Sequence, residues 1–213
     1  MDLIPDALYQ YAEEYTTTES ELLRNIDRET HLHVLRPRMI SGHLQGRLLA
    51  MLSQMIKPKY ILEIGTYTGY SALCLAEGLQ EGGKIVTIEK NEELKSQVDT
   101  YIQNSPFSDK IDNMIGEAQS IIPNLKYPWD MVFIDADKEN YAFYFDQTID
   151  QVNPGGYIIA DNVLWSGKVF DKNQNDKVTN VIRDFNQKVH EDPRVENILL
   201  PIRDGLMILR KND

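Results

Sequence analysis

The sequence predicts an α/β protein built on a mostly parallel sheet of about seven strands, and three observations support this. From residue 60 onward, short apolar runs alternate with amphipathic segments, as in parallel sheets with helices on both faces. The last two apolar runs are separated by only a few residues around Arg203-Asp204, so they should pair as an antiparallel hairpin. Residues 1–58 show no strand pattern and should form two or three extra helices.

The elements follow from apolar runs bounded by turn residues. The predicted strands are residues 60–65, 84–89, 111–116, 129–135, 154–161, 195–202 and 205–211. The predicted helices between them are residues 70–79, 91–105, 118–125, 139–152 and 177–192. Gly82-Gly83 and Ser105-Pro106 should end the first two of these helices. This order predicts one Rossmann-like domain, with residues 1–58 as a helical cap and residues 59–213 as the core.

Composition narrows the class of protein. A chain of 213 residues with 42% hydrophobic and 26% charged residues suits one soluble globular domain. No apolar run approaches the ~18–20 residues of a membrane span, and the N-terminus, MDLIPDALYQYAEEYTTTES, lacks the features of a signal peptide. The single cysteine, Cys74, lies in an apolar helical pattern, so it should be buried rather than reactive. We therefore expect a cytoplasmic protein.

The charge of the chain bears on its partners. The net charge of −11 makes a nucleic-acid partner less expected, because an acidic surface repels phosphates. One basic segment, residues 24–47, is the exception, with five arginines and three of the four histidines. We expect a solvated helix face near a substrate mouth there, with an RNA-binding surface as the alternative. No cysteine or acid completes a metal cluster with the histidines, which are His31, His33, His43 and His190.

Acidic residues gather at one rim of the predicted sheet. In sheets of this type, ligands bind beyond the carboxyl ends of the strands, near the point where strand order reverses. Four predicted strands end in an acid: Glu63, Glu89, Asp135 and Asp161. The stretch VFIDADKENY, residues 132–141, runs from an apolar strand directly into two carboxylates and Lys138. Charges in this position can cap a helix, lie in solvent or bind a ligand.

The segment EIGTYTGYS, residues 63–71, predicts a strand, a glycine turn and a helix start. Its glycine spacing differs from the dinucleotide fingerprint, and no lysine of a triphosphate loop follows. Glu89 could accept hydrogen bonds from both ribose hydroxyls, while Glu63 suits a cationic group such as an amino-acid end. A nucleoside joined to an amino acid, without phosphate, describes S-adenosylmethionine. A purely structural tight turn is the alternative.

Three motifs, LEIGTYTGYS, FIDADKENY and GGYIIADNVLWSGKV, occur in this order and spacing. They resemble the cation-dependent class I O-methyltransferases, which include catechol and caffeoyl-CoA O-methyltransferases and small bacterial relatives. The resemblance covers about residues 30–211. It implies methyl transfer from S-adenosylmethionine to a vicinal-hydroxyl, catechol-like small molecule. A related bacterial branch methylates 5-hydroxyuridine in tRNA, which remains the alternative. The family is usually dimeric, and the helical N-terminus would be the natural interface.

The resemblance also implies roles for residues at matching positions. Asp135, Asp161 and Asn162 would hold a divalent cation, and Lys138 would be the catalytic base. The residues that would surround the cofactor are Ser41, Glu63, Gly65, Tyr67, Ser71, Glu89, Ala118, Gln119, Asp135 and Asp137. For Asp137, the alternative role is to cap the helix that starts at Lys138.

The residue types support this chemistry independently. Two carboxylates and an amide oxygen suit Mg²⁺ above all, with Ca²⁺ and Mn²⁺ as alternatives, whereas zinc prefers His or Cys. Such a cation polarises a phenolic hydroxyl and stabilises the oxyanion that forms. Lys138 lies three residues after Asp135, so both side chains can face one site. The alternative of a non-catalytic cofactor-binding protein is disfavoured, because the residues that the reaction would need are all present: Asp135, Lys138, Asp161 and Asn162.

The loop of residues 163–180 should shape the acceptor pocket. Trp165 is expected to form an apolar wall for an aromatic ring, with packing on the sheet edge as the alternative. In plant enzymes of the family, the segment before the RDF motif carries aromatic and basic residues that handle the CoA ester. Here that segment, NDKVTNVIRDF, has Val178 and Ile182 and no tyrosine. We therefore expect a smaller catechol-like acceptor than a CoA thioester.

Overall fold

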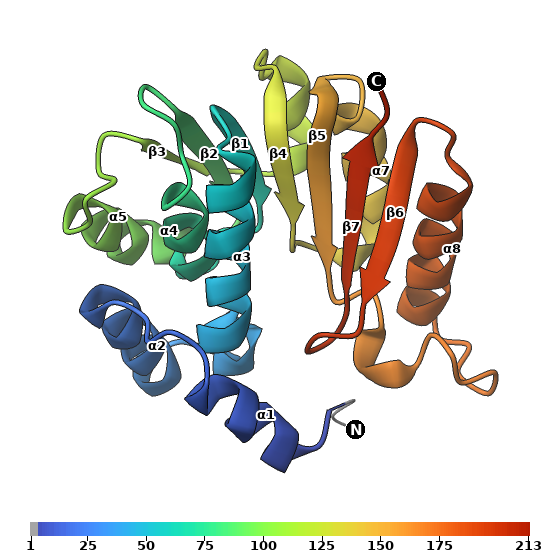
Figure 1. Ribbon diagram of the computed structural model, residues 1–213, viewed down its shortest axis with the longest axis horizontal. Helices are drawn as coiled ribbons and strands as arrows, with labels where there is room; N and C mark the ends of the chain where they lie inside the picture. Colours follow the sequence, from blue (N-terminus) through green and yellow to red (C-terminus); the bar gives the residue numbers. More distant parts are fainter. Residues whose placement is uncertain (1–3) are drawn as a thin grey trace.

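The computed structural model describes residues 4–213 and contains one seven-stranded sheet (Figure 1). The strand order is β3-β2-β1-β4-β5-β7-β6, with β1 to β5 parallel and β7 antiparallel to both of its neighbours. The strands are β1 (Tyr60–Ile64), β2 (Lys84–Glu89), β3 (Ile111–Ile115), β4 (Trp129–Ile134), β5 (Val152–Asp161), β6 (Val195–Leu200) and β7 (Leu206–Lys211). The predicted Rossmann-like α/β fold with its C-terminal hairpin is confirmed.

Helices cover both faces of the sheet. They are α1 (Asp6–Glu14), α2 (Glu21–His33), α3 (Gly42–Ile56), α4 (Tyr70–Ala76), α5 (Lys95–Gln103), α6 (Ala118–Ile121), α7 (Tyr141–Thr148) and α8 (Lys177–Glu191). Short 3₁₀ turns are η1 (Pro37–Met39), η2 (Glu92–Leu94), η3 (Ile122–Asn124), η4 (Lys138–Asn140) and η5 (Trp165–Gly167). Among residues 4–213, no helix is both long enough and apolar enough to cross a lipid bilayer.

Alternation along the strands divides the core into two layers. Ile61 and Phe133 face one layer, which also contains buried side chains of α2 to α5. Leu62 and Val132, their sequence neighbours, face the other layer with α7 and α8. Because successive strand residues point to opposite faces, an uninterrupted apolar strand supplies both layers. Cys74 is fully buried in the first layer, as predicted.

The N-terminal helices share that first layer with the sheet. Ile26 of α2 and Leu49 of α3 are fully buried in the same cluster as Ile61 of β1. The hydroxyl of Ser20 accepts a hydrogen bond from the N–H of Leu23 at 3.3 Å and so caps the start of α2. The shared burial of Ile26, Leu49 and Ile61 holds α2 and α3 against the sheet.

The main local difference from prediction lies at the start of β5. Trp129 pairs with Val152, but Met131 pairs with Tyr157, so β5 contains extra residues in a bulge. The bulge includes Gly155, which has a φ of +74°. The sequence Pro154-Gly155-Gly156 indicated a turn before the strand, whereas the strand already begins at Val152.

The order of the strands creates one open rim. From the adjacent strands β1 and β4, the chain continues to β2 and β3 on one side and to β5 on the other. The carboxyl ends of these parallel strands therefore meet where strand order reverses. In Figure 1 these ends point downward, and α1 passes below them.

Candidate active site

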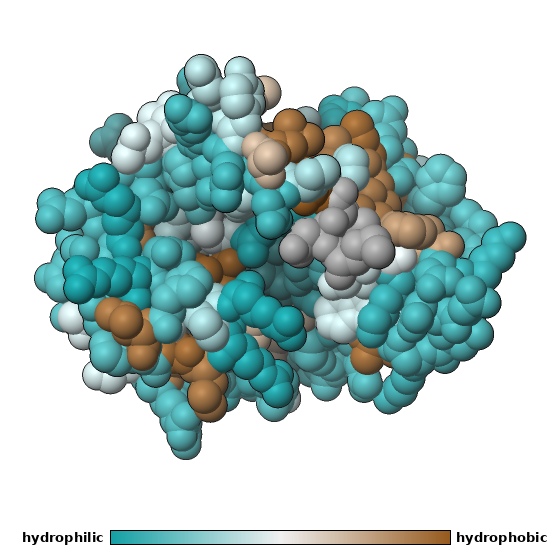
Figure 2. Space-filling model, turned by 90° about the horizontal axis from the view of Figure 1, so that it is seen from below, coloured by the Kyte–Doolittle hydropathy of each residue, from teal (hydrophilic) through white to brown (hydrophobic). Residues whose placement is uncertain are grey.

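A cleft of about 1410 Å³ opens at the carboxyl ends of β1, β2, β4 and β5. Its walls come from the N-terminal segment, the glycine turn after β1, the segments after β4 and β5, and the β6–β7 turn. Figure 2 looks onto this side of the molecule, where a largely hydrophilic surface surrounds a hollow. The acidic rim predicted from the sequence therefore borders a real cavity.

Most of the predicted site residues line this cleft. They are Ser41, Gly65, Tyr67, Ser71, Glu89, Ala118, Asp135, Asp137, Lys138, Asp161, Asn162 and Trp165. Two others do not form part of its wall. Glu63 is fully buried, and Gln119 is exposed on the first turn of α6.

Gly65 allows the ends of β1 and β4 to approach each other. It has a φ of +102°, and a Cβ atom added there would lie 2.2 Å from the carbonyl oxygen of Asp135. No side chain fits at that distance, so only glycine is compatible with this contact. The glycine turn and the carboxylate after β4 are thus held against each other by main-chain packing.

Glu63 is a carboxyl group with no exposure to solvent. The hydroxyl of Thr87 donates a hydrogen bond to its Oε2. Burial raises the pKa of Glu63 to about 8, and the nearby charges of Asp135 and Glu89 act in the same direction. A cationic group placed close to Glu63 would favour its ionised form.

Glu89 joins the glycine turn to the end of β2. Its two carboxylate oxygens accept hydrogen bonds from the N–H groups of Tyr67, at 2.8 Å, and Asn91, at 2.9 Å. The hydroxyl of Tyr67 lies 3.1 Å from the carbonyl oxygen of Leu35 and 3.3 Å from that of Arg36. Tyr67 therefore connects the glycine turn to the segment between α2 and α3.

Lys138 lies where several oxygen atoms converge. Its Nζ donates to Oδ1 of Asp135 at 3.0 Å and to the hydroxyl of Tyr141 at 2.5 Å. That hydroxyl lies 3.0 Å from the carbonyl oxygen of Asp161, to which it donates. Burial, together with the charges of Asp135 and Asp161, raises the pKa of Tyr141 well above its ordinary value, so the hydroxyl stays protonated. Tyr141 lies in the predicted helix of residues 139–152, but no role in the site was predicted for it.

Asp161 is held by two donors. Its Oδ1 accepts from the N–H of Asn162 and its Oδ2 from Nε2 of Gln45, each at 2.6 Å. Burial and the charge of Asp135 raise its pKa to about 7. A cation placed beside Asp135 and Asp161 would favour the ionised form of Asp161.

Gln45 was not predicted as a site residue. It lies on α3, 116 positions before Asp161, and it is completely buried. Its other amide atom, Oε1, has no hydrogen-bond partner among residues 4–213. A polar residue at an inward position of an apolar helix was the signal available in the sequence.

Asp137 does not cap the following helix with its side chain, although it holds the N-cap position. Its Oδ1 accepts from the hydroxyl of Tyr144 at 2.7 Å, and its Oδ2 accepts from the side-chain amide of Asn140. The carboxylate is thus oriented by side chains at the wall of the cleft.

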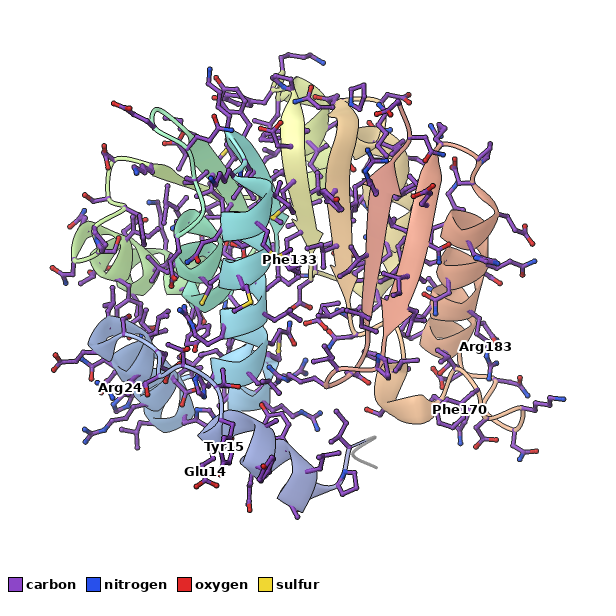
Figure 3. All side chains as sticks on the ribbon, in the orientation of Figure 1. Glu14, Tyr15, Arg24, Phe133, Phe170 and Arg183 are labelled. Carbon is purple, nitrogen blue, oxygen red and sulfur yellow. The ribbon has the colours of Figure 1, made fainter. Side chains whose placement is uncertain are left out.

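The loop after β5 forms the far wall of the cleft. Trp165 and Val178 line the cavity, whereas Ile182 is fully buried in the protein core. Arg183 of α8 anchors the loop, because its guanidinium donates to four main-chain carbonyl oxygens at 2.7–2.9 Å. These belong to Lys168, Val169, Asp171 and Gln174. Figure 3 labels Arg183 beside Phe170 of this loop.

Unusual backbone conformations concentrate at the same cavity. Seven non-glycine residues among positions 4–213 have a positive φ, and six of them line the cleft. The six are Arg36, Tyr67, Asn162, Trp165, Ser166 and Arg203. Backbone strain of this kind clusters at functional sites, where the surrounding structure maintains it.

Known proteins share this architecture. A model of the O-methyltransferase family matches residues 13–212. A caffeoyl-CoA O-methyltransferase from Petroselinum crispum is 36% identical over 220 residues, which cover 97% of this chain and 91% of that protein. An O-methyltransferase from Bacillus cereus, in complex with SAH, superposes with a TM-score of 0.88 at 32% identity, with 97% of both chains covered. An SAH-bound methyltransferase from Podospora anserina gives a TM-score of 0.90 at 28% identity, with 99% of both chains covered. The chain belongs to the O-methyltransferase family.

Proposed function

We propose that this protein transfers a methyl group from S-adenosylmethionine to a hydroxyl of a catechol-like small molecule, with the help of a divalent cation. The observation that carries the proposal is the arrangement of Lys138, Asp135 and Asp161 beside the glycine turn, in one cleft. The family match and the caffeoyl-CoA O-methyltransferase relatives support this reaction class.

The cofactor would occupy the part of the cleft between the glycine turn and β2. The SAH-bound Bacillus cereus enzyme supports this choice of cofactor. In our proposal Glu89 binds the ribose, while the carboxylates of Asp137 and Glu63 stabilise the positively charged amino group of the methionine part. The other cofactor contacts would come from Ser41, Gly65, Tyr67, Ser71, Ala118 and Gln119.

The donor set fits a divalent cation. Residues 4–213 contain no cluster of three or more His, Cys, Asp or Glu side chains arranged for a metal ion. The proposed set instead combines two carboxylates, Asp135 and Asp161, with the amide of Asn162, a combination that suits Mg²⁺, with Ca²⁺ and Mn²⁺ as alternatives. When bound, the cation would polarise the acceptor hydroxyl and stabilise its oxyanion.

The protein's own groups account for the remaining chemistry. Lys138 donates hydrogen bonds to Asp135 and Tyr141, and in our proposal its neutral amine takes the proton from the acceptor hydroxyl. Trp165 offers an apolar wall for the acceptor ring. Holding the acceptor oxygen in line with the methyl group would supply much of the rate acceleration.

The acceptor in this proposal is smaller than a CoA thioester. Val178 lines the cleft, and the neighbouring Ile182 is buried in the core, so this segment offers no aromatic side chain to a larger ester. The tRNA alternative finds no support in the comparisons. In the basic segment 24–47, His31 and His33 each lie beside an acidic residue of the same helix, and Arg47 is paired with Glu77.

We also propose a cytoplasmic homodimer that associates through its helical N-terminus. Three large apolar side chains at positions 8, 11 and 15 are 58–73% exposed along one side of α1 and its end: Leu8, Tyr11 and Tyr15. Met51 and Met55 of α3 are also exposed. Apolar residues at this spacing form a continuous stripe, which a second copy could cover. The molar mass in solution, measured by light scattering, tests this proposal.

Turnover is the direct test of the proposed reaction. Purified protein would be incubated with S-adenosylmethionine and 3,4-dihydroxybenzoate or caffeate, with Mg²⁺ or with EDTA, and S-adenosylhomocysteine would be measured by mass spectrometry. We expect turnover that requires Mg²⁺, is abolished in Lys138→Ala and is unchanged in Lys172→Ala, an exposed lysine outside the cleft. Equal turnover with EDTA, or full activity of Lys138→Ala, would refute this mechanism.

A further inference from the structure

Arg203 is a partly buried cation with little compensation inside the protein. Its one hydrogen bond among residues 4–213 runs from Nη1 to the carbonyl oxygen of Ile40, at 3.0 Å, and no carboxylate there lies within ion-pair distance of it. Three other arginines are partly buried, and each contacts a carboxylate or several carbonyl oxygens: Arg47, Arg183 and Arg210. A guanidinium has five N–H groups, so Arg203 retains donors for a ligand.

The position of Arg203 directs those donors toward the acceptor side of the cleft. It lies in the β6–β7 turn with a φ of +50° and lines the cavity together with Tyr9 and Trp165. A Cβ atom added at Gly42 would lie 3.6 Å from Nη1 of Arg203, so the guanidinium lies beside the start of α3. Asp161 and Asn162, predicted cation ligands, line the same cavity.

Two acidic residues on this side are engaged by other groups of the protein. The carboxylate of Asp204 accepts a hydrogen bond from the N–H of Ser166, and Glu139 forms an ion pair with Lys177 at 3.1 Å. Two further cations, Arg38 and Lys168, line the same cleft, and Lys168 forms an ion pair with Asp176 at 3.8 Å. The acceptor end of the cavity therefore combines the guanidinium of Arg203 with Asp135 and Asp161, the proposed cation ligands, whereas the cofactor end carries Glu89, Glu117 and Asp137.

We infer that the methyl acceptor carries a carboxylate on its ring substituent and that Arg203 binds this carboxylate. This inference rests on the proposed catechol O-methyltransferase function. The planar guanidinium fork matches a carboxylate, and partial burial strengthens the attraction. An ester bearing several phosphates is disfavoured, because the chain has a net charge of −11.

The test compares caffeate with its methyl ester, which has the same catechol ring but no charge. Both would be assayed for turnover, and their binding to the protein saturated with S-adenosylhomocysteine and Mg²⁺ would be measured by calorimetry. The variants are Arg203→Gln, Arg203→Lys and, as a matched control, Arg210→Gln, which alters an arginine outside the cleft. Thermal melting would verify that each variant is folded.

We expect the wild type to prefer caffeate by on the order of 10- to 100-fold in kcat/KM and in affinity. Arg203→Gln should bring that ratio close to 1 through loss of caffeate affinity, with methyl-ester binding and S-adenosylmethionine affinity retained. Arg203→Lys should keep part of the preference, and Arg210→Gln all of it.

Other outcomes would overturn the inference. Equal affinity of the wild type for both compounds, or an unchanged ratio in Arg203→Gln, would do so. Loss of S-adenosylmethionine affinity in Arg203→Gln would assign the side chain to the cofactor instead. If neither compound is methylated but caffeate still binds more tightly through Arg203, the proposed reaction fails while the carboxylate site stands.

Discussion

The side-chain amide of Gln45 donates a hydrogen bond of 2.6 Å to Oδ2 of Asp161, and this contact joins α3 to the end of β5. Both residues are buried, so removal of the amide would leave Oδ2 of Asp161 without its side-chain donor. The orientation of Asp161 in the cleft thus depends on a helix that precedes the first strand.

Replacement of Gln45 by leucine should weaken divalent-cation binding by about 10-fold, since partners of metal ligands typically contribute this much. The affinity for Mn²⁺, measured by electron paramagnetic resonance, checks this without relying on turnover. Gln54→Leu changes an exposed glutamine on the same helix and should leave the affinity unaltered. Unchanged Mn²⁺ affinity in Gln45→Leu would show that Asp161 is oriented without the amide.

The pKa of Glu63, raised by burial to about 8, predicts a pH dependence of stability in the absence of cofactor. The folded state holds a proton that the unfolded state releases above its ordinary pKa of 4.5. The stabilising contribution is therefore complete below about pH 4.5 and is lost as the pH rises to about 8. The loss amounts to at most about 1.4 kcal/mol per pH unit.

Glu63→Gln removes this group while keeping its size. Urea denaturation at pH 6, 7, 8 and 9 should show the variant gaining stability relative to the wild type up to pH 8, then no further change. A constant difference between the two proteins across this range would mean that Glu63 does not carry the proton.

Tyr141→Phe should lower kcat for methyl transfer by about 10-fold, because Lys138 loses the hydroxyl that helps to hold it. The free energy of unfolding should fall by about 1–3 kcal/mol, since the main-chain oxygen of Asp161 also loses its donor. Rates across a pH series, together with thermal melts, separate the two effects. Tyr157→Phe removes a tyrosine hydroxyl outside the cleft and serves as the control. A variant with normal kcat would show that Asp135 alone positions the lysine.

Arg183→Ala should raise the KM for the acceptor and leave cofactor affinity unchanged, because the loop it anchors lies on the acceptor side. Limited proteolysis should then cut within residues 168–176, which lose their attachment to α8. Lys188→Ala, on the same helix, controls for loss of positive charge. An acceptor KM equal to that of the wild type would contradict the anchoring role.

The sequence predicted the fold well, because burial on both faces of a parallel sheet forces apolar runs that are easily read. Asp135 and Asp161 were placed at one rim by the same rule. Gln45 was not predicted, since it acts across 116 positions. Arg183 was not predicted either, since its partners are main-chain oxygens, which no residue type in the loop reveals. The bulge at the start of β5 was missed because local residue types do not encode strand register.

Arg183 holds the loop after β5 through hydrogen bonds to main-chain oxygen atoms alone. Every peptide unit has such an oxygen, whatever side chain it carries, so these hydrogen bonds depend little on the identity of residues 168–174. The side chains at these positions can therefore change while the main chain keeps the same path. Exchange of residues 168–174 between relatives should then alter acceptor preference without a change in the rest of the fold.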